Sequence, residues 1–262
     1  MTPDFPACGA RLRTMRFALL LAVLLAVLLA GCAASRTPLN DAVSATAPDE
    51  APDAALRAVE AVPGGLPYAV DAAHSQVRIL VFRAGSAARL GHNHVLTVPR
   101  LQGRLWTPAQ GLAGARFALA FRLDELLLDP PAQRADLGAG WASVLAPDAL
   151  AATREHMLGP DNLQAEAFPW VRLRSLQIMG EAPRLAAELE IELHGQRRRQ
   201  WVALEARPSE QGGWAVSGSL VLSQSDYGVR PYSVLGGLLA VQDALVIDFG
   251  LELRPGPRTE SR

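Results

Sequence analysis

The sequence predicts an all-β domain in which antiparallel strands curl into a closed barrel. Apolar and polar residues alternate with period two in several separate segments, which is typical of strands with one buried and one solvated face. Only one segment has a helical pattern. Roughly 190 residues carry these patterns, which suits a single domain of about eight strands. Closure would leave no strand edge unpaired, and a β-sandwich is the alternative.

The beginning of the chain has the pattern of an export signal. The apolar run Phe17–Ala30 follows three arginines and is shorter than the roughly 20 residues that a transmembrane helix needs. The sequence LAGC, which ends at Cys32, resembles the lipobox of bacterial lipoproteins. That resemblance implies a lipoprotein signal peptide over residues 1–31 and lipidation of Cys32. An ordinary secretory signal with a chance cysteine is the alternative.

Residues 32–65 are predicted to be a lipidated flexible tether, because they are rich in Ala, Pro, Asp, Ser and Thr and poor in large apolar residues. No aspartate follows Cys32, which in lipoproteins of this type implies the outer membrane. Cys8 is the other cysteine, so the folded part is expected to have no disulfide. We therefore expect a lipid-anchored protein on the periplasmic face of the outer membrane of a Gram-negative bacterium.

The charge of the chain argues against one class of partner. The sequence contains 25 basic residues, all of them arginine, and its formal net charge is −1. A nucleic-acid-binding protein would carry a basic excess, so no nucleic acid is predicted as a partner.

The predicted elements follow in order after the tether. Alternating segments are Ser75–Arg83, Arg116–Leu123, Arg184–Leu193, Trp214–Leu222 and Leu245–Leu253. Glycine-containing turns are predicted after Leu193, with Arg197–Arg199 at the tip, and at Glu210–Gly213. Pro147–Leu158 is the single predicted helix, and residues 124–146 are predicted to be irregular.

Four short motifs, in the same order, make the chain resemble the YceI-like periplasmic proteins. The motifs are Tyr68-x-x-Asp71-x-x-His74-Ser75-x-Val77, Phe168-Pro169, Leu193-His194-Gly195 and Ser225-Asp226-Tyr227-Gly228. The resemblance implies an extended, lipocalin-like, eight-stranded antiparallel β-barrel, which we expect over residues 66–254 together with the one short helix. Residues 255–262 are expected to be a disordered tail. It also implies an apolar lipid ligand, a polyisoprenoid or quinone-type chain, inside the barrel. No cofactor beyond such a lipid is implied, and without a nucleophile elbow no enzyme is predicted.

The inward-facing side chains of the strands are predicted to hold the ligand. These residues are Val77, Ile79, Val81, Arg83, His92, His94, Phe117, Leu119, Phe121, Leu189, Ile191, Ile247 and Phe249. The interior of an eight-stranded barrel accommodates either its own side chains or one small ligand. A stress-related lipoprotein with a packed barrel is therefore an alternative. Arg83 ends an inward-facing row, so we expect it to meet a carboxylate or an anionic head group.

The stretch RLGHNHVL places His92 and His94 two residues apart at the start of a predicted strand, where they would share a face. Gly91 is expected to supply a positive φ, and Leu90 and Leu96 to pack inward. The favoured interpretation is contact with the polar head of a ligand at the opening of the barrel. A metal-binding or metal-dependent protein is the alternative and needs further ligands. Candidates for these are His74, His156 and Asp226.

Overall fold

The computed structural model describes Leu56, Val59 and residues 65–256. The predicted signal peptide and Cys32, the predicted lipidation site, lie outside the described residues, as do most of the predicted tether and tail. The described residues all belong to one compact unit, which spans Asn40–Arg262. No described helix is long and apolar enough to cross a membrane.

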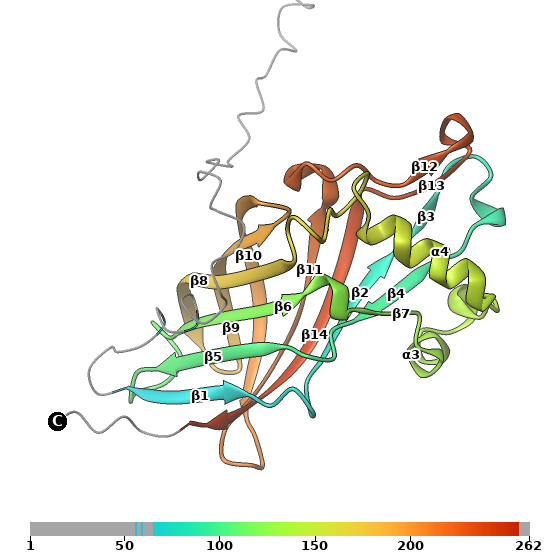
Figure 1. Ribbon diagram of the computed structural model, residues 1–262. Helices are drawn as coiled ribbons and strands as arrows, with labels where there is room; N and C mark the ends of the chain where they lie inside the picture. The colour runs from blue at the N-terminus through green and yellow to red at the C-terminus, as the bar shows by residue number, and fades with distance from the viewer. Residues whose placement is uncertain (1–55, 57–58, 60–64, 257–262) are drawn as a thin grey trace, which may run out of the picture. The chain divides into compact units, whose positions relative to one another are not determined.

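Eight antiparallel strands within residues 65–256 form a closed ring (Figure 1). Their order is β1-β5-β6-β8-β9-β10-β11-β14, and pairing of β14 with β1 closes the ring. The strands are β1 (Leu66–Val70), β5 (Gln102–Thr107), β6 (Arg116–Arg122), β8 (Trp170–Glu181), β9 (Arg184–Leu193), β10 (Gln196–Pro208), β11 (Trp214–Ser223) and β14 (Ala244–Pro255). The predicted antiparallel β-barrel is confirmed.

A second branch of the sheet continues from the middle of β14. It consists of β2 (Gln76–Val81), β4 (His94–Thr97) and β7 (Leu127–Leu128) in that order. Among the described residues β7 pairs with β4 alone, so this wall ends at β7. The predicted helix, α4 (Pro147–Leu158), lies beside this edge, because Arg154 donates to the carbonyl oxygens of Leu126 and Asp124.

Several short elements were not predicted. A three-stranded sheet, in the order β12-β13-β3, projects beside α4 (Figure 1). It consists of β3 (Arg83–Ala84), β12 (Ser233–Val234) and β13 (Leu239–Val241), with the 3₁₀ helices η1 (Ala88–Leu90) and η5 (Leu235–Gly237) in its loops. The segment predicted to be irregular contains α3 (Pro131–Asp136), η3 (Ala139–Trp141) and most of η2 (Leu123–Glu125). A fifth 3₁₀ helix, η4 (Gln224–Tyr227), follows β11.

The hairpin between β9 and β10 is tighter than predicted. His194 and Gly195 alone form the turn, with φ values of 52° and 68°, which is the backbone of a type I′ turn. Arg197–Arg199 therefore lie inside β10 instead of at a hairpin tip. There Arg197 pairs with Glu192 of β9 at 3.0 Å, as part of the charged outer face.

The core consists of alternate residues along the strands. The five apolar positions that alternate along β9 are all at most 7% exposed. They are Leu185, Ala187, Leu189, Ile191 and Leu193. A smaller cluster joins Leu56 and Val59 to Trp106 and Ala118. Leu56 and Val59 fall within the segment predicted to be a tether, and at these two positions the segment contacts the barrel.

Candidate functional site

A cavity of about 550 Å³ occupies the interior of the barrel. Apolar side chains from β2, β6, β8, β9, β11 and β14 supply most of its lining. Small-molecule sites in proteins usually measure about 300–1,000 Å³ and have mainly apolar walls. The structure therefore supports a hollow barrel rather than the packed one.

Eleven of the thirteen residues predicted to hold a ligand line this cavity. They are Val77, Ile79, Val81, His94, Phe117, Leu119, Phe121, Leu189, Ile191, Ile247 and Phe249. Several of these side chains are only partly buried, although they point inward, because they border the hollow space. Their contact with a ligand stays a prediction.

Arg83 does not line the cavity, and its predicted inward orientation is wrong. β2 ends at Val81, and the chain then enters β3 of the small sheet, so the alternation of β2 does not extend to Arg83. The side chain is exposed, and its Nη1 donates to the carbonyl oxygen of Gly91 at 2.9 Å. Arg83 therefore stabilises the loop before β4.

The predictions about the start of β4 are also wrong in part. Gly91 has a φ of −97°, so it does not use the left-handed region. Leu90 is 67% exposed, whereas Leu96 is 4% exposed and lines the cavity. Because β4 begins at His94, His92 lies in the preceding loop and is exposed. His92 and His94 therefore occupy different environments.

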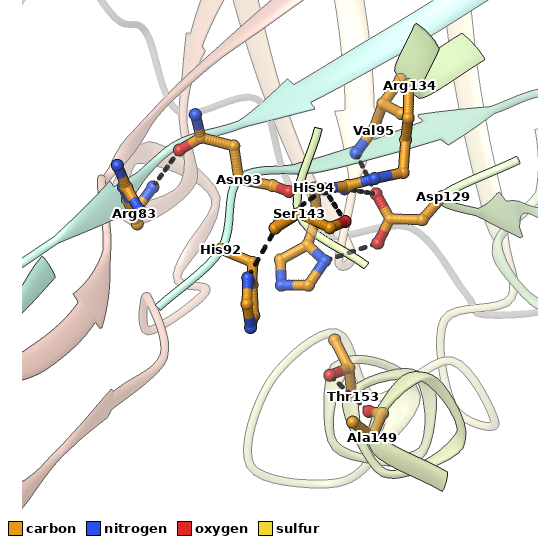
Figure 2. A network of polar contacts seen from close by, with 10 residues as sticks. All are labelled: Arg83, His92, Asn93, His94, Val95, Asp129, Arg134, Ser143, Ala149 and Thr153. Carbon is orange, nitrogen blue, oxygen red and sulfur yellow. Dashed lines mark hydrogen bonds and ion pairs between the residues drawn. The ribbon is translucent and has the colours of Figure 1, made fainter. Parts of the chain in front are cut away.

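His94 is held by a fully buried carboxylate (Figure 2). Its Nδ1 lies 2.6 Å from Oδ2 of Asp129, whose side chain is 0% exposed. The other oxygen, Oδ1, accepts the backbone N–H of Val95 at 2.9 Å and Nη1 of Arg134 at 2.6 Å. Burial alone would raise the pKa of Asp129, but the hydrogen bonds from His94, Val95 and Arg134 outweigh burial and lower it.

The ionised carboxylate determines which atom of His94 is available to a ligand. A carboxylate without a proton is only an acceptor, so the hydrogen must be on Nδ1 of His94. Nε2 then has no hydrogen-bond partner among the described residues, and in Figure 2 it points away from Asp129. Since the ring lines the cavity, Nε2 can serve as an oriented polar contact there.

Arg134 of α3 connects this carboxylate to the histidine loop (Figure 2). The side chain is 9% exposed, and Nη1 also donates to the carbonyl oxygen of Asn93 at 2.8 Å. Its Nη2 donates to Oγ of Ser143 at 2.9 Å. The long segment between β7 and α4 thus supplies the groups that hold the backbone around His94.

His92 makes a separate contact with Ser143, in which its Nδ1 lies 3.1 Å from the serine Oγ. Partial burial and the charges of His94, Arg134 and Arg83 lower the pKa of His92, so its ring is neutral near neutral pH. The described residues contain no group of three or more His, Cys, Asp or Glu side chains able to hold a metal ion. The structure therefore gives the metal interpretation no support.

The cavity opens beside α4. His156 and Tyr232 both border the cavity and are exposed, and their rings meet edge to face with centroids 4.6 Å apart. Other polar lining residues at this end include Asn162, whose side chain donates to the carbonyl oxygen of Arg230 at 2.8 Å. Sequence reasoning missed Asn162 and Tyr232, because neither lies in an alternating or helical pattern.

Comparison with known proteins gives one family and several related folds. The family described as "YceI-like domain" matches residues 68–253. A crystal structure of Burkholderia cenocepacia BcnA is 14% identical, covers 70% of this chain and 98% of its own, and has a TM-score of 0.51. A polyisoprenoid-binding domain from Saccharophagus degradans is 13% identical, covers 73% and 99%, and has a TM-score of 0.49. No curated protein matches the chain.

Proposed function

Because the chain belongs to the YceI-like family, we propose that it is a binding protein that holds one long apolar lipid inside its barrel. The observation that carries this proposal is the cavity of about 550 Å³ with an almost wholly apolar lining. Each buried CH₂ group of a ligand is worth about 0.8 kcal/mol, so a branched hydrocarbon chain gains affinity from its whole length. A polyisoprenoid or quinone-type tail fits this chemistry, and the proposed role is binding rather than catalysis.

The polar head of the lipid would lie near His94, at the end of the cavity that opens beside α4. Asp129 orients the ring, so a head group meets Nε2 without further ordering of the protein. A hydroxyl group can donate to Nε2 of a neutral ring or accept from a protonated one, whereas a quinone carbonyl can only accept. A hydroxyl head is therefore compatible with either form of the ring, and a quinone carbonyl only with the protonated form.

The proposal includes the location that the N-terminal pattern predicts. Lipidation of Cys32 would attach the protein to the outer membrane on its periplasmic face. The tether would then keep the barrel close to the outer membrane, whose lipids could supply the ligand. The bound lipid would be shielded from water during storage or carriage.

A matched pair of substitutions on β11 tests the cavity as the binding site. Val216 lines the cavity, whereas Val221 on the same strand is outward-facing and 59% exposed. We expect Val216→Trp to fill part of the hollow and to weaken binding of a fluorescent polyisoprenoid probe by at least about tenfold, and Val221→Trp to leave affinity unchanged. Equal affinities for the probe in both variants would contradict binding inside the barrel.

A further inference from the structure

Three exposed leucines lie on neighbouring loops of the small sheet, and we call this group the leucine tip. Leu90 is 67% exposed, Leu235 71% and Leu238 47%. The loops are joined by hydrogen bonds, because the Ala87 N–H donates to the carbonyl oxygen of Leu238 at 2.9 Å and the Leu90 N–H to that of Ala87. A cluster of large apolar side chains on the surface of a soluble domain usually marks an interaction site.

The backbone at Leu235 gives a second indication. Its φ is 53°, in the left-handed region that disfavours most side chains and suits glycine or asparagine. Gly236 and Gly237, which follow, also have positive φ values of 65° and 91°. A leucine at this place costs conformational energy and contributes little packing, since its side chain is exposed. Its presence is better explained by an external contact than by folding.

The two segments that build the leucine tip carry charged side chains of one sign. Residues 82–94 and 228–242, which build the tip and its supporting strands, include Arg83, Arg89 and Arg230 and contain no Asp or Glu. All three arginines are exposed. Because the whole chain has a net charge of −1, this basic excess is local. Such a surface is complementary to an anionic partner.

The leucine tip also adjoins the opening of the cavity. Val241 of β13 and Tyr232 before β12 both line the cavity, and the N–H of Val241 donates to the carbonyl oxygen of Tyr232 at 2.9 Å. In Figure 1 the loops of β12, β13 and β3 project from the barrel on the side of α4. The exposed leucines and the cavity opening therefore belong to the same part of the molecule.

We propose that the leucine tip docks on the surface of a bilayer that contains anionic phospholipids. The leucines enter the boundary between head groups and acyl chains, and the arginines contact lipid phosphates. This contact directs the cavity opening toward the membrane. It differs from the anchor at Cys32 and requires no particular ligand in the cavity.

The test uses a chain that begins at Asn40, which removes the region of the lipid anchor but keeps the compact unit with its closed barrel. Thermal unfolding first checks that this chain is folded. Co-sedimentation is then measured with vesicles of phosphatidylcholine alone and of phosphatidylcholine mixed with phosphatidylglycerol. We expect binding to the anionic vesicles that weakens as salt is added. Absence of binding to anionic vesicles would overturn the proposal.

A matched control separates the leucine tip from general surface apolarity. Leu238 is 47% exposed and Leu127, on β7, is 50% exposed. We expect Leu238→Ser to lower the vesicle partition coefficient by about tenfold and Leu127→Ser to leave it unchanged. Equal losses in the two variants would overturn the assignment of the surface.

Leu235→Asn distinguishes docking from folding. Asparagine tolerates a positive φ better than leucine, so this variant should be at least as stable as the wild type and yet bind vesicles more weakly by about tenfold. Unchanged vesicle binding would contradict the proposal.

Sedimentation velocity tests the other possible apolar partner, a second copy of the chain. Self-association that Leu238→Ser abolishes, without vesicle binding by the wild type, would assign the tip to a contact between two copies of the chain instead.

Discussion

Replacement of Asp129 by Asn tests how the loop that carries His94 is held. The buried carboxylate accepts hydrogen bonds from three groups, on His94, Val95 and Arg134. The asparagine retains one carbonyl oxygen, which can serve Val95 and Arg134. Its amide group would face the Nδ1–H of His94, donor against donor, and the guanidinium of Arg134 would lose its counter-charge while 9% exposed.

The expected loss in the free energy of unfolding follows from these contacts. Removal of one partner of a buried ion pair costs about 3–5 kcal/mol. The donor left without a partner on His94 would add about 1–3 kcal/mol if its ring could not rearrange. We therefore expect Asp129→Asn to cost at least about 3 kcal/mol. Addition of Arg134→Met should recover part of this loss, because it removes the unpaired charge.

The dependence on pH gives a second measure of the same contacts. The folded protein lowers the pKa of Asp129 from its ordinary value of 3.8, so its stabilising contribution is full above about pH 4 and is lost as the pH falls through the folded-state pKa. The Asn variant lacks this group, and the difference between the two proteins should narrow below about pH 4. Urea unfolding of both proteins measures this difference. If Asp129→Asn lowered the free energy of unfolding by less than about 1 kcal/mol at neutral pH, the reasoning would be refuted.

Three further outcomes are expected. His94→Phe should weaken binding of a hydroxylated polyisoprenoid by about 0.5–1.5 kcal/mol in a fluorescence titration, whereas equal loss in His92→Phe would contradict the assigned geometry. The hydroxyl of Tyr227 is buried without a hydrogen-bond partner among the described residues, and burial raises its pKa above 10.0. Below about pH 10 the hydroxyl is neutral in both states, so in urea unfolding Tyr227→Phe should be as stable as the wild type at neutral pH. Above about pH 10 the unfolded wild type ionises while burial keeps the folded hydroxyl neutral, so the wild type should lose stability that Tyr227→Phe retains. A loss above about 1 kcal/mol in Tyr227→Phe at neutral pH would be contrary. Cys32→Ser should move the protein from the membrane fraction to the soluble one, and unchanged sedimentation would contradict lipidation.

The sequence predicted the parts of the fold that follow from local periodicity. In β9 every second residue is apolar, and each of those residues is buried, because a strand in a barrel has one inner face along its whole length. The helix α4 spans Pro147–Leu158, the range that its helix-forming residues predicted, and ends before Gly159. Elements with these signals were placed almost to the residue.

The parts that were missed depend on contacts between distant segments. Arg83 does not have its predicted orientation, because β2 ends at Val81 and Arg83 pairs with β13, which comes more than 150 residues later in the sequence. The partners of His94 and of the neighbouring Asn93 are supplied by a segment 35 to 41 residues further along. Neither the spacing of residues nor the composition of the chain predicts contacts between segments so far apart in the sequence. The local pattern found the histidine that borders the cavity, and only the structure separated it from His92.

Native mass spectrometry of the protein purified from bacterial membranes, followed by organic extraction, tests the central claim most directly. The account predicts a complex of one protein with one apolar lipid, and an extract that contains a polyisoprenoid or quinone-type molecule. Val216→Trp, purified in the same way, should carry much less of that lipid. A folded wild-type protein whose mass is that of the polypeptide and its anchor alone, with no lipid in the extract, would contradict the account.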